Sequence, residues 1–316
     1  MDNDFQKADF QQLSWDARLE DDWLALVHLA IREDLSGLQD QTSASLIPAR
    51  LPGQAAIVAR QPGVIAGLPA AQIALREISA ELRWSPHLSD GDPVKPGDEV
   101  ATISGPAKEL LTAERLVLNT IGRLSGIASL TRQYVEAVAG AGAKIYDTRK
   151  TTPGWRRLEK YAVRMGGGAN HRTGLFDAVL IKDNHLALRQ SSGAGASFPA
   201  AEAVRAAQAF VANEAGVNAS TRMLVEVEVD TLEQLAEVLP ARPDIVLLDN
   251  MPPETLRRAV AMRDAGYRDV QLEASGGIGL ANVRAIALTG VQRISIGALT
   301  HSAAWLDVGL DWRPAG

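Results

Sequence analysis

Six short apolar, largely β-branched runs alternate with helical stretches from residue 144 onward, and this rhythm constrains the fold more than any other feature. Each run ends in polar or charged residues. The runs are residues 144–147, 178–182, 223–229, 244–248, 270–273 and 293–296. Alternation of this kind predicts a parallel sheet. Strands this short, and this regularly followed by helices, favour a closed β/α barrel over an open doubly wound sheet.

The intervening stretches carry their own start and stop signals. Residues 200–215 have helical spacing, and Gly216 stops them. Asp230 with Glu233 resembles a capping box for the next helix. The following helix opens at Pro252 and Pro253, and another spans about residues 281–288. These signals support one helix after most strands.

The first hundred residues have a different sequence pattern, without the regular alternation of strands and helices. Residues 14–33 have the apolar spacing of an amphipathic helix, and residues 54–67 are typical of a hairpin. Two more strands are predicted at residues 82–88 and 99–104, joined by a turn-rich segment. We therefore expect an antiparallel sheet with attached helices.

A long helix is predicted between the two parts, over residues 111–140. Thr112 is its expected N-cap, and Gly126 is a possible break into two helices. Arg115 follows Glu114 in the first turn, and on local grounds it is expected to form a surface ion pair.

A barrel places catalytic groups at the carboxyl ends of its strands, and charged or glycine-rich segments stand at those ends here. They are Arg149 and Lys150, Lys182 and Asp183, Glu226 and Glu228, Asp249 and Asn250, residues 273–277, and Gly297. A buried unpaired charge is strongly unfavourable. We therefore expect these charges to be paired with one another or with a ligand.

Residues 147–185 form a basic island in an acidic chain. They carry eight Lys or Arg against four acidic residues, a local balance of +4 in a protein whose net charge is −6. Residues 166–168 are three glycines, where backbone can approach a ligand closely. Singly, the basic side chains would be read as solvated surface charges. Jointly, the arginines suit carboxylates and the lysines suit phosphate, so a ligand bearing both groups is predicted.

Further polar residues suggest how such a ligand is held. Ser275, Gly276 and Gly297 lie in late βα loops, where barrels often bind phosphate. Glu228 and Asp249 end adjacent strands and could share hydroxyls or a diphosphate-bound Mg²⁺. The alternative for these two acids is a salt bridge to Lys150 or Lys182.

The two histidines of the basic island are His171 and His185, and neither has metal-ligand spacing to a partner. A hydrogen-bonding role is expected for His171. For His185, a structural capping role remains an equal alternative.

Composition excludes several classes of protein. The chain has no cysteine, which excludes disulfides, a thiol nucleophile and thiolate metal sites. No export signal and no apolar run of about 18 residues is visible, so a cytoplasmic protein without a membrane segment is expected. The acidic net charge argues against nucleic-acid binding.

The basic island closely resembles the corresponding region of quinolinate phosphoribosyltransferases. The similarity continues in family order from Glu114 to Ser302, through ERLVLNTIGRLSGIASLT, EVEV, VLLDNM, LEASGGI and ISIGALTHS, and more loosely at EDLSGLQDQTSASLIP. Trp155 and Met165 depart from the leucine and cysteine that members often carry. Trp155 leaves the basic residues intact but could reshape a pocket wall.

The resemblance implies a type II phosphoribosyltransferase architecture, with an N-terminal α/β sandwich and an incomplete β/α barrel. Residues 1–125 would form the sandwich and residues 126–300 the catalytic barrel, with the tail 301–316 returning to the sandwich. It also implies a homodimer, or a higher oligomer, in which barrel and sandwich of different subunits share each active site. The implied activity is phosphoribosyl transfer from phosphoribosyl pyrophosphate to quinolinate with decarboxylation.

By matching motif, the resemblance also implies roles for individual residues. Quinolinate would contact Arg149, His171, Arg172 and the partner subunit's Arg115. Lys150 and Lys182 would contact phosphoribosyl pyrophosphate or substrate, and Glu228 and Asp249 would hold ribose hydroxyls and Mg²⁺. Ser275, Gly276 and Gly297 would bind the 5′-phosphate. The residues implied to be catalytic are Lys150, Lys182, Glu228 and Asp249.

Three other activities remain open at this point. A paralogous phosphoribosyltransferase of the molybdenum-transport-associated branch would use another acceptor. A Schiff-base aldolase would use Lys182. A nucleotide sensor would bind without turnover.

Overall fold

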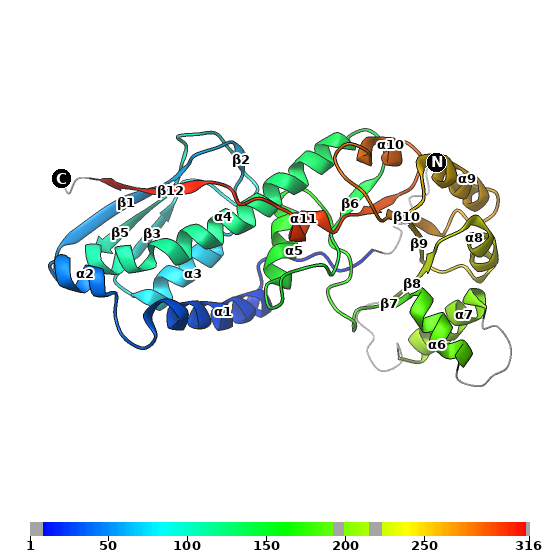
Figure 1. Cartoon of the computed structure of the whole chain (residues 1–316), viewed down its shortest axis with the longest axis horizontal. Coiled ribbons are helices and arrows are strands. Elements are labelled where there is room, and N and C mark those ends of the chain that lie inside the picture. Colours follow the sequence, from blue (N-terminus) through cyan, green and yellow to red (C-terminus); the bar gives the residue numbers. More distant parts are fainter. Residues whose placement is uncertain (1–8, 192–198, 215–222, 314–316) are drawn as a thin grey trace. The chain divides into compact units, whose positions relative to one another are not determined.

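The computed structural model describes residues 9–191, 199–214 and 223–313 and divides the chain into two compact units (Figure 1). The barrel unit comprises Met1–Gln12, Tyr134–Arg149 and Ala169–Gly297. The sandwich unit comprises Leu13–Gln133, Lys150–Gly168 and Ala298–Gly316. The predicted domain boundaries at residues 125 and 300 stay predictions. Among the described residues, no helix combines the length and the apolar character that crossing a bilayer needs.

The barrel unit is built on a six-stranded parallel sheet with the order β6-β11-β10-β9-β8-β7. Its strands are β6 (Lys144–Tyr146), β7 (Ala178–Ile181), β8 (Leu224–Val229), β9 (Ile245–Asp249), β10 (Gln271–Ser275) and β11 (Arg293–Ser295). All six predicted strands are confirmed, with ends that differ by one or two residues.

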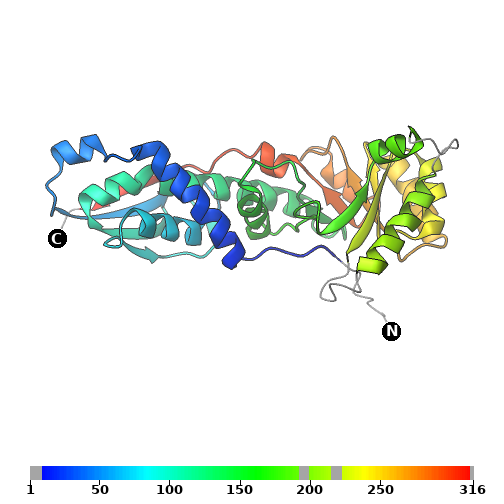
Figure 2. The same ribbon diagram turned by 90° about the horizontal axis from the view of Figure 1, so that it is seen from below.

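Helices follow the strands along the chain, as the alternation predicted. They are α6 (Asp183–Ser191), α7 (Ala200–Glu214), α8 (Leu232–Val238), the 3-10 helix η1 (Leu239–Ala241), α9 (Pro253–Asp264) and α10 (Val283–Ala287). Figures 1 and 2 show α7, α8 and α9 on one side of the sheet. Gly216, the predicted stop of α7, lies outside the described residues.

The capping box of α8 is one residue later than predicted. Thr231 is the N-cap, its side chain accepts the N–H of Gln234, and the Gln234 side chain accepts the N–H of Thr231. The prediction of Asp230 with Glu233 was wrong because two overlapping four-residue windows both fit the capping-box pattern.

The sandwich unit packs helices on a four-stranded antiparallel sheet with the order β12-β1-β5-β3. The strands are β1 (Pro52–Ala59), β3 (Arg83–Pro86), β5 (Glu99–Pro106) and β12 (Val308–Arg313), with a separate pair β2 (Gly63–Val64) and β4 (Pro93–Val94). The helices are α1 (Ala17–Leu35), α2 (Gln41–Leu46), α3 (Leu68–Ile78), α5 (Arg156–Met165) and α11 (Ala298–His301), together with α4 (Ala107–Ala137), whose last turn belongs to the barrel unit. The apolar core joins β1 and β5 to α3 and α4.

The predicted return of the C-terminal tail is confirmed, since β12 pairs with β1. The predicted hairpin over residues 54–67 is wrong. β1 pairs with β5 and β12, whereas β2 pairs with β4. The two strands are neighbours in sequence but belong to different sheets, so the turn between them does not set their pairing.

Helix α4 also differs from its prediction at two positions. It begins at Ala107, and Thr112 lies inside it, where its hydroxyl donates to the carbonyl of Lys108 at 3.1 Å. It also continues through Gly126 without a break. A Cβ at Gly126 would lie 2.1 Å from the Ala304 carbonyl oxygen. Close packing of the segment after α11 therefore explains this glycine.

Candidate active site

The strand register places four acidic side chains on one face of the barrel sheet. Glu228 pairs with Leu247, and Leu247 pairs with Glu273. Side chains alternate along a strand. Glu226 lies two residues before Glu228 on β8, and Asp249 lies two residues after Leu247 on β9. Both therefore share this face. The face carries two levels, one within the strands and one at their carboxyl ends.

The level at the carboxyl ends contains partly exposed polar groups. Lys182, directly after β7, forms an ion pair with Glu228 of β8. Asp249, the last residue of β9, accepts a hydrogen bond from Asn250 Nδ2 at 2.7 Å. The salt-bridge alternative for Glu228 is therefore confirmed for Lys182, and the pair remains within reach of solvent.

The loop after β10 is shaped by glycine. Ser275 lies opposite Asp249 in the sheet, and Gly276 has a φ of 87°. A Cβ at Gly276 would lie 2.3 Å from Asn250 Oδ1. Backbone and the Asn250 amide are thus packed together where the sequence predicted phosphate binding. Gly297 follows β11, whose neighbour in the sheet is β10.

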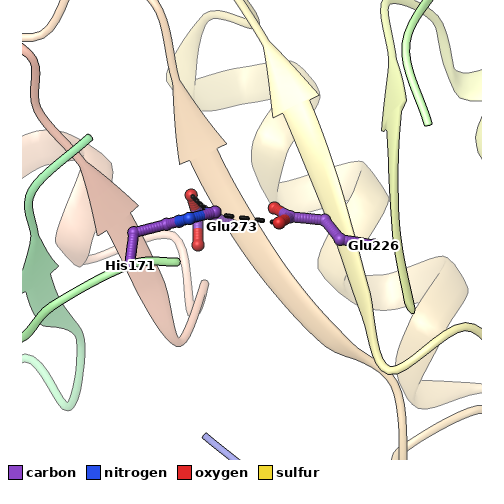
Figure 3. Close-up of side chains that lie close together, drawn as sticks. All are labelled: His171, Glu226 and Glu273. Atoms are coloured by element: carbon purple, nitrogen blue, oxygen red, sulfur yellow. Dashed lines mark ion pairs between the residues drawn. The ribbon is translucent and has the colours of Figure 1, made fainter. Parts of the chain in front are cut away.

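The level within the strands is a buried cluster of charge, shown in Figure 3. His171 Nε2 lies 3.1 Å from Glu226 Oε2 and 3.4 Å from Glu273 Oε1. Glu273 Oε2 accepts a hydrogen bond from Arg293 Nε at 2.8 Å. Both glutamates and Arg293 have no exposed surface, and His171 is 5% exposed. The strands β8, β10 and β11 are therefore joined by ion pairs inside the barrel.

The surroundings shift the pKa values of this cluster. Burial lowers the pKa of His171, but the negative charges of Glu226 and Glu273 outweigh it and raise this pKa to about 10. Burial raises the pKa of Glu273, while His171 and Arg293 outweigh it and lower this pKa to about 2. Glu273 is therefore ionised at neutral pH.

One contact of His171 opposes full protonation of its ring. The backbone N–H of Arg172 donates to His171 Nδ1 at 2.8 Å, which requires a lone pair on that nitrogen. The pKa of His171 is nevertheless raised, because the two buried carboxylates of Glu226 and Glu273 face Nε2. Whether the ring is neutral or cationic, Nε2 carries a hydrogen.

This hydrogen decides whether the cluster could bind a metal ion. Candidate ligand atoms of His171, Glu226 and Glu273 lie within 4.8 Å of one another. A metal-bound imidazole needs the lone pair of Nε2 and normally donates through Nδ1. Here Nδ1 accepts a hydrogen bond, so the geometry fits a ring whose Nε2–H faces two carboxylates and not a metal site.

Two arginines of the basic island, Arg149 and Arg172, belong to the barrel unit. Arg172 is 7% exposed, and its NH1 donates to the carbonyl of Ala178 at 3.2 Å. Burial and then the positive charge of Arg149 lower the pKa of Arg172. The like charges of the two guanidinium groups therefore interact, and an anion bound to both would offset that repulsion.

The other predicted site residues occupy different settings. Arg115 is exposed in the sandwich unit, 3.6 Å from Glu114, which agrees with the expected surface pair. The carbonyl of Lys150 in the same unit accepts a hydrogen bond from the Thr300 hydroxyl at 2.7 Å. His185 Nδ1 accepts the backbone N–H of Lys182 at 2.9 Å, so the structural capping role of His185 is confirmed.

Several residues of the buried cluster were not singled out from the sequence. Asp9 accepts hydrogen bonds from Arg293 NH1 and from the Tyr146 hydroxyl, each at 2.8 Å. Asp147 has no exposed surface and accepts the backbone N–H of His171 at 2.9 Å. An arginine at an inward position of a buried strand, as in β11, was the available signal for such a cluster.

The raised pKa of His171 predicts a specific dependence of stability on pH. The folded state binds the proton more tightly than the unfolded state, whose pKa is near 6.5. This stabilisation is complete below pH 6.5 and is lost as pH rises through about 10. The free energy of unfolding, measured with urea between pH 6.5 and 10, should therefore fall more steeply with pH for the wild type than for His171→Gln. The difference in slope should reach up to about 1.4 kcal/mol per pH unit. Parallel profiles would indicate a neutral ring.

Comparison with known proteins agrees with this arrangement. The family model for the quinolinate phosphoribosyl transferase C-terminal domain matches residues 127–311, and the model for the N-terminal domain matches residues 40–125. The chain is 44% identical over 287 residues to the carboxylating nicotinate-nucleotide pyrophosphorylase of Mycobacterium leprae, covering 90% of this chain and 95% of that protein.

Two further relatives extend the likeness. The human carboxylating nicotinate-nucleotide pyrophosphorylase is 39% identical over 288 residues, which is 90% of each chain. The structure of the nicotinate-nucleotide pyrophosphorylase from Francisella tularensis superposes with a TM-score of 0.82 at 32% identity, covering 96% of this chain and all of that one. The predicted combination of an incomplete β/α barrel with an N-terminal α/β domain is thereby confirmed. This chain belongs to the quinolinate phosphoribosyl transferase family.

Proposed function

We propose that this protein transfers the phosphoribosyl group of phosphoribosyl pyrophosphate to quinolinate, with decarboxylation, in de novo NAD biosynthesis. The products are nicotinate mononucleotide, CO₂ and pyrophosphate. The observation that carries the proposal is the match of both family domains, in a chain whose barrel strands carry Lys182, Glu228 and Asp249 at or near their carboxyl ends. Neither the fold nor the relatives described above favour the paralogous acceptor.

Quinolinate needs positive groups with planar geometry for its two carboxylates. Arg149 and Arg172 supply two guanidinium groups whose charges influence each other. His171 directly precedes Arg172 and accepts its backbone N–H. For the His171 ring to bind a carboxylate itself, a contact to Arg172, Glu226 or Glu273 must give way.

Phosphoribosyl pyrophosphate needs groups for its ribose, phosphate and diphosphate. Glu228 and Asp249 are proposed to hold the ribose hydroxyls, with Lys182 and Lys150 near the charged groups. Backbone groups of Ser275, Gly276 and Gly297 are proposed for the 5′-phosphate, a role that the close, glycine-dependent packing after β10 suits.

Magnesium is the expected cation of such a site. Glu228 and Asp249 are oxygen donors on neighbouring strands, and Mg²⁺ is commonly held by one or two carboxylates together with substrate phosphates. The donor set therefore fits Mg²⁺. The ion would neutralise diphosphate charge when bound.

The chemistry requires positioning more than proton transfer. The pyridine nitrogen of quinolinate already has a lone pair, so no general base is needed to create the nucleophile. Arginine and lysine side chains offset the repulsion between a dicarboxylate and a diphosphate. Departure of pyrophosphate leaves positive charge on the ribose, which the carboxylates of Glu228 and Asp249 stabilise. The pyridinium formed then stabilises the carbanion left at C2 as CO₂ departs, and a proton from water at C2 completes nicotinate mononucleotide.

We further propose a cytoplasmic homodimer in which the partner subunit's Arg115 completes each quinolinate site. Its exposure in the sandwich unit leaves the Arg115 side chain available for such a contact.

The activity is tested directly with purified protein, quinolinate, phosphoribosyl pyrophosphate and Mg²⁺. We expect nicotinate mononucleotide, CO₂ and pyrophosphate in equal amounts, with no CO₂ when either substrate is omitted. A folded protein that binds neither substrate and releases no CO₂ would contradict the proposed function. Borohydride trapping should give no adduct at Lys182, because no Schiff base forms.

Replacing Arg172 by lysine tests its carboxylate role. Arg172→Lys keeps the charge but loses the two parallel hydrogen bonds of a guanidinium group. We expect the Kd for quinolinate to rise by about 10- to 100-fold, which corresponds to a loss of about 1.5–3 kcal/mol. Arg242→Lys, at an exposed pair with Asp269, is the matched control and should leave binding unchanged. Wild-type affinity in Arg172→Lys would remove Arg172 from this role.

Mixing two inactive variants tests the shared site. Arg115→Ala subunits mixed with Arg172→Ala subunits should regain part of the activity, because one site of each hybrid dimer then has both arginines. Mixing each variant with itself is the control. If tagged subunits exchange and no activity returns, each subunit has a complete site of its own.

A further inference from the structure

The barrel sheet is open between β6 and β7, and a segment of the basic island lies along the β6 edge. Ala169 pairs with Tyr146 in a parallel bridge. The Ala169 N–H donates to the Ile145 carbonyl at 2.8 Å, and the Asp147 N–H donates to the Ala169 carbonyl at 3.1 Å. This short extension leads directly into His171 and Arg172. The backbone before the proposed quinolinate ligands is therefore held as an added edge of the sheet.

The N-terminal segment Asp9–Gln12 contacts this extension at its next residue. The Gln12 side chain accepts the backbone N–H of Asn170 at 2.7 Å and donates to the Asn170 carbonyl at 3.1 Å. Its Nε2 also donates to the Phe10 carbonyl at 2.8 Å. The carboxamide thus bonds both backbone groups of Asn170, much as a neighbouring strand would. A side chain with both a donor and an acceptor is required for this pairing.

Phe10 packs against the buried cluster within the same unit. Its ring centroid lies 4.3 Å from that of His171, and it belongs to a buried apolar group with Ala178, Leu224 and Ile245. The guanidinium of Arg293 lies 4.9 Å from the Phe10 ring centroid. Phe10 therefore separates the apolar end of the barrel interior from the charges of His171 and Arg293.

Asp9 adds a charge to the same arrangement. Its two carboxylate oxygens accept from Arg293 NH1 and the Tyr146 hydroxyl. Arg293 in turn donates to Glu273, which faces His171. Gln12 thus bonds the backbone of Asn170, and Phe10 contacts the ring of His171. Asp9 is linked to the same ring through Arg293 and Glu273. Gln11, the remaining residue of this segment, is exposed.

We propose that Asp9, Phe10 and Gln12 are positioning residues for quinolinate binding, which hold His171 and Arg172 from inside the open barrel. The inference rests on the proposed function for the identity of the ligand. It concerns a segment that lies outside both regions matched by the family models, residues 40–125 and 127–311. A role in folding alone would affect stability. A positioning role changes quinolinate affinity in protein that remains folded.

Gln12→Glu tests the proposal, with Gln11→Glu as the matched control for added charge. The glutamate keeps the shape of Gln12 but sets a carboxylate against the carbonyls of Asn170 and Phe10. We expect the Kd for quinolinate, measured by calorimetry, to rise about tenfold, as the loss of two hydrogen bonds implies. The KM for phosphoribosyl pyrophosphate should stay within about twofold. Amide exchange at residues 169–172 should be faster in Gln12→Glu and unchanged in Gln11→Glu.

Phe10→Leu is the second variant, because it keeps apolar volume and removes the ring contact with His171. It should also weaken quinolinate binding while near-ultraviolet circular dichroism shows an intact fold. If either variant is folded and binds quinolinate with wild-type affinity, the residue replaced has no positioning role. Failure of the wild type to bind quinolinate would instead contradict the proposed function. Amide exchange would then still report whether Gln12 holds residues 169–172.

Discussion

The ion pair of Glu273 with Arg293 and His171 is the interaction on which the rest of the site depends. Moving these groups from water into the barrel is costly, and their mutual attraction, with the contacts of Asp9 and Glu226, offsets that cost. Removing one partner from such a cluster typically costs about 3–5 kcal/mol, because an uncompensated charge remains buried. The cluster ties β10, β11 and the loop after Gly168 together. The backbone that presents Arg172 is thereby fixed before any ligand arrives.

Because side chains alternate along a strand, successive positions on one face of the sheet carry first a buried polar group and then a partly exposed one. Glu226 is buried and faces His171, whereas Glu228, two residues later on the same face, is partly exposed and pairs with Lys182. Glu273 and Ser275 repeat this arrangement on β10. One level is therefore neutralised within the protein, while the next retains groups that can exchange a protein partner for a ligand. A βα scaffold gains this division from strand geometry alone.

The sequence predicted the elements whose signals are local and missed those that depend on distant partners. The six barrel strands were correct because apolar runs and polar ends lie within each strand. Lys182, Glu228 and Asp249 could be named because a barrel gathers strand ends. The hairpin at residues 54–67 was wrong because pairing is decided by strands far along the chain. Gln12 and Asn170 are 158 residues apart, and nothing near Gln12 indicates that contact.

In the proposed function, the like charges of Arg149 and Arg172 would favour a doubly charged acceptor. Burial and like charge both disfavour the protonated form of Arg172, while Glu226 and Asp177 partly compensate. A ligand with two carboxylates would remove the remaining repulsion and supply planar acceptors for both side chains. A monocarboxylate could satisfy only part of this need. In the proposed function, discrimination between quinolinate and a pyridine with a single carboxylate would therefore follow from the mutual repulsion of Arg149 and Arg172 in the free protein.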